Sequence, residues 1–117
     1  MIQAHLKELL ERSGVFPPAA ELTVQEGPGG AIRMICSWLL ENDPERPDKR
    51  STPIKILVHD RAADLFHNAN AKMLKRLDEA LVQVLFRRMK RYRADHGLPY
   101  HRSPPPFEIR IDALDLD

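Results

Sequence analysis

Cys36 is the only cysteine of the chain and the first residue to consider as a nucleophile. A thiol becomes reactive where a base or a positive charge lowers its pKa. Cys36 instead alternates with Met34 and Trp38 in a pattern of period two, which predicts a buried apolar face. No serine lies in a nucleophile-elbow pattern, and no pair of carboxylates stands out as acid and base. We therefore expect no catalytic residue and no enzyme activity.

A short stretch of histidine and aspartate invites comparison with a metal site. Residues 60, 64 and 67 would share one face of a helix, and imidazole with carboxylate suits zinc or another divalent ion. The spacing of His59, Asp60, Asp64 and His67 matches no established metal motif, however. Asp60 and Asp64 also have simpler roles, as the N-cap and as a first-turn acid of the helix. We predict no metal and no other cofactor, and no small-molecule ligand is indicated.

Positive charge is concentrated in one segment of the chain. The formal net charge is only +1, yet residues 61–106 hold ten basic and four acidic side chains. On a helix, six of the basic residues fall within about 120° of one another, and we call them the basic ridge: Lys72, Lys75, Arg76, Arg87, Lys90 and Arg93. Such a ridge could follow the phosphates of a nucleic acid, or it could be the solvated face of an amphipathic helix.

The same segment carries a second apolar stripe beside the ridge. Val82, Phe86 and Met89 recur at i, i+4 and i+7 on a helix, outside the stripe that forms the core. Two interpretations stay open. The first helix of the chain could pack against this stripe, or the stripe could remain exposed as an interface for another protein.

Apolar periodicity predicts the elements that position these residues. Ile2, Leu6, Leu9 and Leu10 predict a helix over residues 1–12. Alternation with period two predicts strands over residues 21–26, 31–40, 54–58 and 107–111, the first two joined as a hairpin. Residues 61–93 have helical period, with a break or kink near residues 68–70, where asparagines favour caps. The core stripe of this segment comprises Met73, Leu77, Leu81, Val84 and Leu85.

This order of elements predicts a single α+β domain over residues 1–117. We expect a mostly antiparallel four-stranded sheet, with helices packed on one face and the last strand beside the first. Residues 41–50 hold charged side chains and two prolines, which predicts an exposed loop. Residues 112–117 form an acidic tail, expected either to be disordered or to approach Arg87, Arg91 or a neighbouring subunit. Removal of residues 114–117 is expected to leave thermal stability nearly unchanged.

The chain lacks the marks of a membrane or exported protein. Its longest uninterrupted apolar stretches are far shorter than the ~20 residues that span a bilayer. Charged residues interrupt the first twelve positions, so no signal peptide is visible, and one cysteine permits no internal disulfide. We expect a cytoplasmic protein.

The order of helix, three strands and helix over residues 1–93 resembles that of the double-stranded-RNA-binding domain. The second helix of that family begins with a basic cluster, whereas the segment here begins Arg61, Ala62, Ala63, Asp64. The resemblance therefore implies the topology and carries over no phosphate-contacting residue.

Two functions follow from these patterns. The first is a non-enzymatic protein-interaction module, homodimeric through the long helix, with Val82, Phe86 and Met89 at the interface. The alternative is binding of a nucleic-acid backbone along the basic ridge, between residues 72 and 93. Six per cent aromatic residues argue against base stacking, so phosphate contacts would have to supply the affinity.

Overall fold

A computed structural model describes residues 2–39, 51–92 and 106–116 of the chain. The elements follow the order α1 (Ile2–Arg12), β1 (Glu21–Glu26), η1 (Pro28–Gly30), β2 (Ile32–Ser37), β3 (Ile54–Val58), α2 (Asp60–His67), α3 (Ala71–Met89), β4 (Phe107–Ile111) and η2 (Ala113–Leu116). The predicted loop over residues 41–50 and Arg93 of the basic ridge lie outside the described residues.

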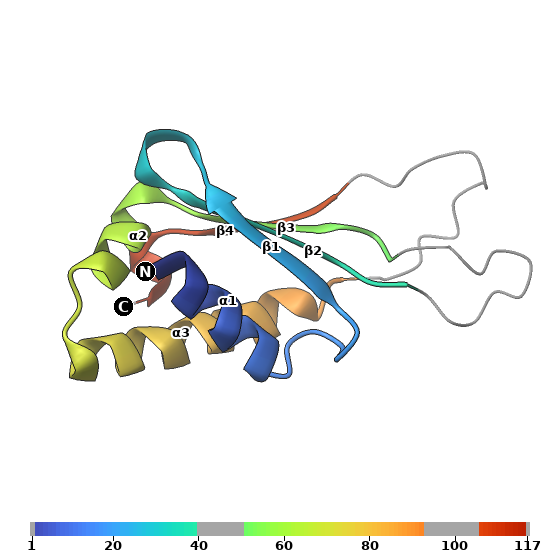
Figure 1. The fold of residues 1–117 in the computed structure, drawn as a ribbon, viewed down its shortest axis with the longest axis horizontal. Coiled ribbons are helices and arrows are strands. Elements are labelled where there is room, and N and C mark those ends of the chain that lie inside the picture. Colours follow the sequence, from blue (N-terminus) through green and yellow to red (C-terminus); the bar gives the residue numbers. More distant parts are fainter. Residues whose placement is uncertain (1, 40–50, 93–105, 117) are drawn as a thin grey trace, which may run out of the picture.

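The strands form one four-stranded sheet, with α1 and α3 on the same face and α2 at one end (Figure 1). The α+β class with helices on one face is therefore confirmed. The hairpin is also confirmed, because β1 and β2 pair antiparallel with Leu22 opposite Cys36. Gly29 and Gly30 turn the chain between the two strands. Their φ angles of 63° and 89° are rarely adopted by residues that have a Cβ.

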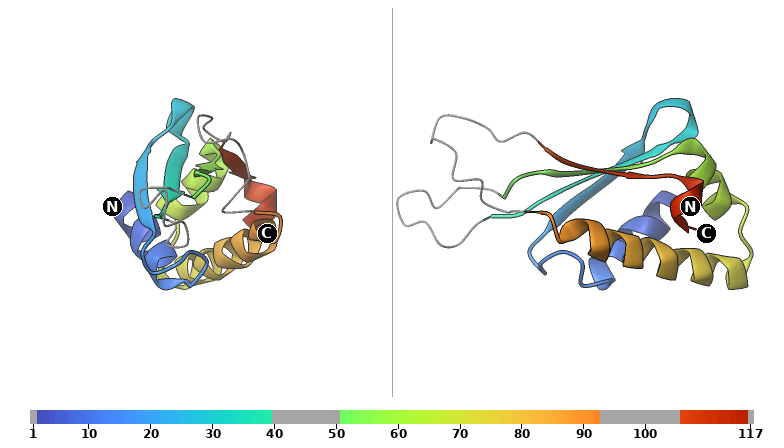
Figure 2. Two further views of the ribbon diagram at one scale, coloured as in Figure 1. Left: turned by 90° about the vertical axis from the view of Figure 1, so that its right-hand side faces the viewer. Right: turned by 180° about the vertical axis from the view of Figure 1, so that it is seen from behind.

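The position of the last strand differs from the prediction. The sheet order is β1-β2-β3-β4, so β4 lies at the edge farthest from β1 (Figure 2). It pairs in parallel with β3, placing Ile56 opposite Ile109. The placement beside β1 was wrong because the crossover through α2 and α3 returns the chain to the strand it has just left, and strand periodicity holds no information about which neighbour that is.

The break in the long helical segment is confirmed. Helix α2 ends at His67 and α3 begins at Ala71, and Asn70 caps α3 by accepting a hydrogen bond from the backbone N–H of Met73 at 2.8 Å. The N-cap of α2 was predicted wrongly. His59 occupies the cap position without a side-chain hydrogen bond. Asp60 is the first helical residue, where its negative charge interacts favourably with the helix dipole.

One core joins the sheet to the helices. Leu6 and Leu10 of α1 and Leu81 and Leu85 of α3 are buried against the face of the sheet that carries Met34, as periodicity predicted. One detail differs from the predicted core stripe. Met73 is 42% exposed, because the first turn of α3 extends beyond the packed part of the core. Ile35, on the face of the sheet opposite the helices, is 37% exposed, so α1 does not cover that face.

The acidic tail is folded over its described part. Residues 113–116 form η2, which packs against α2 and α3, and Leu116 is only 3% exposed within the core. Asp112 and Asp115 fix the turn, because Asp115 accepts a hydrogen bond from the Asp112 N–H and Asp112 accepts one from the Leu114 N–H, both at 2.9 Å. A disordered tail was therefore a wrong prediction over these residues. The apolar side chain of Leu116 packs in the core, which the acidic composition of the tail did not indicate.

Candidate interaction surface

Helix α3 is capped at its start and anchored to the rest of the molecule at its end. Its start is capped by Asn70, as described above. Its end is held by Tyr92, whose ring packs between Trp38 and Phe107 at centroid distances of 5.6 and 5.5 Å. The Tyr92 hydroxyl donates a hydrogen bond to the backbone carbonyl of Thr52, and burial raises its pKa. The outer face of α3 is thus presented by a rigidly placed helix.

The basic ridge lies on that outer face. Lys72, Lys75, Arg76, Arg87 and Lys90 are all exposed. Helix α3 has only two acids, and one of them is already engaged: the carboxylate of Asp78 lies 2.8 and 2.9 Å from Nε2 of His5 in α1. Glu79 is left as the exposed acid of the helix, so the field at this face is strongly positive although the whole chain is nearly neutral.

The stripe of Val82, Phe86 and Met89 is covered unevenly. Met89 is half-buried against the core and Val82 is half-buried, whereas Phe86 is 47% exposed. Packing within the chain therefore accounts for one side of the stripe and leaves its centre open. The exposed ring of Phe86 lies on the same helix face as Glu79 and Lys90, where an aromatic side chain is bordered by charge.

An arginine-lined cleft opens between the last turns of α3 and β4. It has a volume of about 500 Å³, and its walls include Arg87, Arg88 and Arg91 on one side and Phe107, Glu108 and Ile109 on the other. Arg88 donates a hydrogen bond to Asp115 of η2 at 3.3 Å. The tail was predicted to approach Arg87 or Arg91. The contact forms with the neighbouring Arg88 because η2 folds under the strand instead of extending past it.

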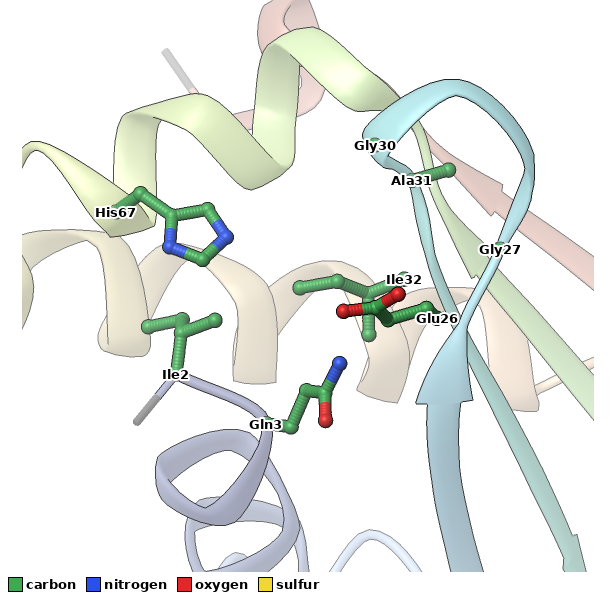
Figure 3. Close-up of a pocket in the computed structure, with 8 residues that line it drawn as sticks. All are labelled: Ile2, Gln3, Glu26, Gly27, Gly30, Ala31, Ile32 and His67. Atoms are coloured by element: carbon green, nitrogen blue, oxygen red, sulfur yellow. The ribbon is translucent and has the colours of Figure 1, made fainter.

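A second cavity, of about 390 Å³, lies between the start of α1, the β1–β2 turn and the end of α2 (Figure 3). Gln3 of α1, Glu26 of β1 and His67 of α2 border it on three sides, with Ile2 and Ile32 between them. These polar groups come from three elements far apart in the sequence, and no periodicity would have brought them together. None of the predicted interface residues lines this cavity.

The residues considered for catalysis and metal binding occupy ordinary positions. Cys36 is fully buried, as predicted, and burial raises the pKa of its thiol to about 11. Among the described residues, no three histidine, cysteine or acidic side chains lie close enough together to hold a metal ion. His59, Asp60, Asp64 and His67 thus stay apart as a ligand set.

Comparisons with models of known families, with curated proteins and with solved structures found no match to this chain. Over residues 2–39, 51–92 and 106–116, no helix combines the length and the apolar character needed to cross a membrane.

Proposed function

We propose that this chain is a non-enzymatic protein-interaction module that binds an acidic partner protein through the outer face of α3. The single observation that carries the proposal is the exposed ring of Phe86 at the centre of a helix face rich in exposed lysine and arginine. Large aromatic side chains and arginines supply most of the binding energy in protein interfaces. Phe86 is the apolar anchor, and the cations select a partner of opposite charge.

The partner surface must complement both features. Acidic side chains opposite Arg87 and Lys90 would raise the association rate, and apolar side chains opposite Phe86 would slow dissociation. A symmetric contact between two copies of α3 meets neither demand well. It would set the basic ridge of one copy against the basic ridge of the other, and close like charges are repulsive. We therefore assign the α3 face to a different protein, in place of the α3-mediated homodimer expected from the sequence.

A second candidate function is binding of a nucleic-acid backbone along the same helix. The cations are spaced from Lys72 to Lys90, a distance of about 27 Å along an α-helix. That length would allow several phosphate contacts, each of which adds to the salt dependence of binding. Phe86 has no necessary part in such contacts.

Phe86 therefore separates the two candidates. The test measures fluorescence anisotropy at near-physiological salt with two labelled probes: an acidic helical peptide carrying leucines at i and i+4, and a DNA duplex. For a protein-interaction module, Phe86→Ala weakens peptide binding about tenfold, since loss of an anchor costs more than about 1 kcal/mol. DNA binding by the same variant is unchanged.

Leu65→Ala is the matched control, because Leu65 is a 40% exposed side chain on another helix, α2. It should bind both probes as the wild type does. Equal peptide binding by wild type and Phe86→Ala would refute the proposal. Tight duplex binding that is lost in Lys72→Glu and Lys90→Glu but retained in Phe86→Ala would favour the nucleic-acid function instead.

A further inference from the structure

The outer edge of β4 has no strand beside it among the described residues. Phe107 donates its backbone N–H to the Pro53 carbonyl, and the Ile111 carbonyl accepts from His59, both at 2.8 Å. These two residues therefore direct their main-chain groups toward β3. Successive residues of a strand direct them to opposite sides, so the N–H and C=O groups of Glu108 and Arg110 point away from the sheet.

This edge lacks three of the devices that commonly block pairing, although the strand is short and carries two charged side chains. Edge strands are commonly blocked by proline, lysine or a bulge. The strand Phe107–Ile111 contains none of these and keeps an uninterrupted register with β3. The free outward-facing main-chain groups end at Arg110, because the next outward N–H, that of Asp112, is already bonded to the carboxylate of Asp115. The available edge therefore consists of Glu108 and Arg110.

We propose that β4 pairs antiparallel with β4 of a second copy, which joins two sheets into one. A twofold axis at Ile109 sets Glu108 of each copy directly opposite Arg110 of the other. Both residues have outward-facing main-chain groups, so each of these two pairs exchanges its backbone hydrogen bonds in both directions. Such isologous pairing is the ordinary form of a homodimer contact.

The charges select this register over its neighbours. Glu108 and Arg110 project on the face of the sheet away from the helices, where they are 48% and 69% exposed and lie 3.7 Å apart as an exposed ion pair within the chain. Opposite charges directly across two strands attract, whereas like charges repel. A shift of the axis onto Glu108 or onto Arg110 would set glutamate against glutamate or arginine against arginine. A register shifted by one residue would set the buried side chains of one strand opposite the exposed side chains of the other.

The arginine-lined cleft opens near this contact. In this register Asp112 of the second copy comes opposite Pro106, at the end of β4 where the arginine-lined cleft opens. Arg87 and Arg91 are exposed and line that cleft. Phe86 lies on a different side of α3 from the cleft and stays free in the dimer.

Sedimentation velocity of the full chain tests this pairing. A short strand contact is a small interface, so we expect a monomer–dimer equilibrium with a dissociation constant on the order of 10 μM. Glu108→Arg and Arg110→Glu should each be monomeric at that concentration, because each sets like charges opposite one another in both pairs. A mixture of the two variants should dimerise, since every arginine then faces a glutamate.

The double variant Glu108→Arg with Arg110→Glu restores complementarity within one chain and should dimerise like the wild type. Gln25→Arg, on the opposite edge strand β1, is the control and should dimerise unchanged. Circular dichroism of each variant verifies the fold. The proposal is overturned if the wild type is monomeric up to about 300 μM, if either single variant still dimerises, or if the folded mixture and the double variant both stay monomeric. Loss of the dimer in Phe86→Asp would also overturn it, because the contact would then lie on α3.

Discussion

At the scale of single residues, burial decides which reactive groups are available. The thiol of Cys36 is fully buried on the helix-facing side of β2. The phenyl ring of Phe86 is almost half exposed although phenylalanine is among the most buried residue types. Burial withdraws the Cys36 thiol from solvent, whereas the ring of Phe86 places an apolar group in contact with solvent. The exposed ring of Phe86 is the feature on which the proposed binding function rests.

The pKa of Cys36 gives a test of its burial. The folded-state value of about 11 lies above the ordinary 9.0, so the unfolded chain releases this proton at a lower pH than the folded chain does. The thiol therefore favours the folded state fully below about pH 9, and this contribution is lost as the pH rises toward 11. Urea unfolding across that range should show a loss on the order of 2 kcal/mol that is missing in Cys36→Ala. Parallel curves for the two proteins would contradict a buried thiol.

At the scale of elements, the caps and turns explain what could be predicted from sequence. Asn70 marked the start of α3 correctly, because an asparagine side chain competes for backbone N–H groups wherever it stands. The strand positions were also predicted, since period two depends only on neighbouring residues. The pairing of β4 with β3 was not, because it depends on how a crossover packs over the sheet.

The C-terminal turn shows the same limit. Asp112 and Asp115 suggested an acidic tail by composition, but their carboxylates cap the turn that delivers Leu116 to the core. Side-chain bonds of this short range are common for aspartate, so the pattern Asp-Ala-Leu-Asp-Leu could have indicated a turn. The contact of Asp115 with Arg88 could not have been chosen over Arg87 or Arg91 without the fold.

Two leucines of this turn make a matched pair for mutation. Leu116 is 3% exposed and Leu114 is 80% exposed. Leu116→Ala should lower the free energy of unfolding by about 2–4 kcal/mol, because it removes buried methyl groups and leaves a cavity. Leu114→Ala should change it by less than about 0.5 kcal/mol. Chemical denaturation of both variants measures the difference, and equal effects would show that η2 is not docked on the core.

At the scale of the whole molecule, the two proposed contacts lie on different elements, α3 and β4, and meet only near Arg87, which belongs to the basic ridge and also lines the cleft beside β4. The α3 face is basic with one aromatic anchor, and the β4 edge is short and self-complementary in charge. A dimer through β4 would therefore present two α3 faces at once. If both engaged one partner assembly, the second contact would form within the complex, which raises the overall affinity without any new kind of interaction.

The candidate surface was only partly predictable. The position of Phe86 outside the core stripe and the clustering of cations both follow from the helical period, which acts within one element. The exposures of Val82 and Met89 do not, because they depend on how far the core extends along α3. The cavity beside His67 and the cleft beside Arg88 each join several elements, and only the tertiary structure brings their residues together.

The central claim, that the α3 face around Phe86 binds an acidic partner, is tested most directly by nuclear magnetic resonance. The labelled chain is titrated with the acidic helical peptide at physiological salt, and backbone amide shifts are followed residue by residue. If this face binds the peptide, the largest changes fall on residues 82–89 of α3, with little change in β1. Changes confined to the cavity bordered by Gln3, Glu26 and His67, or no change in α3 at saturating peptide, would contradict it.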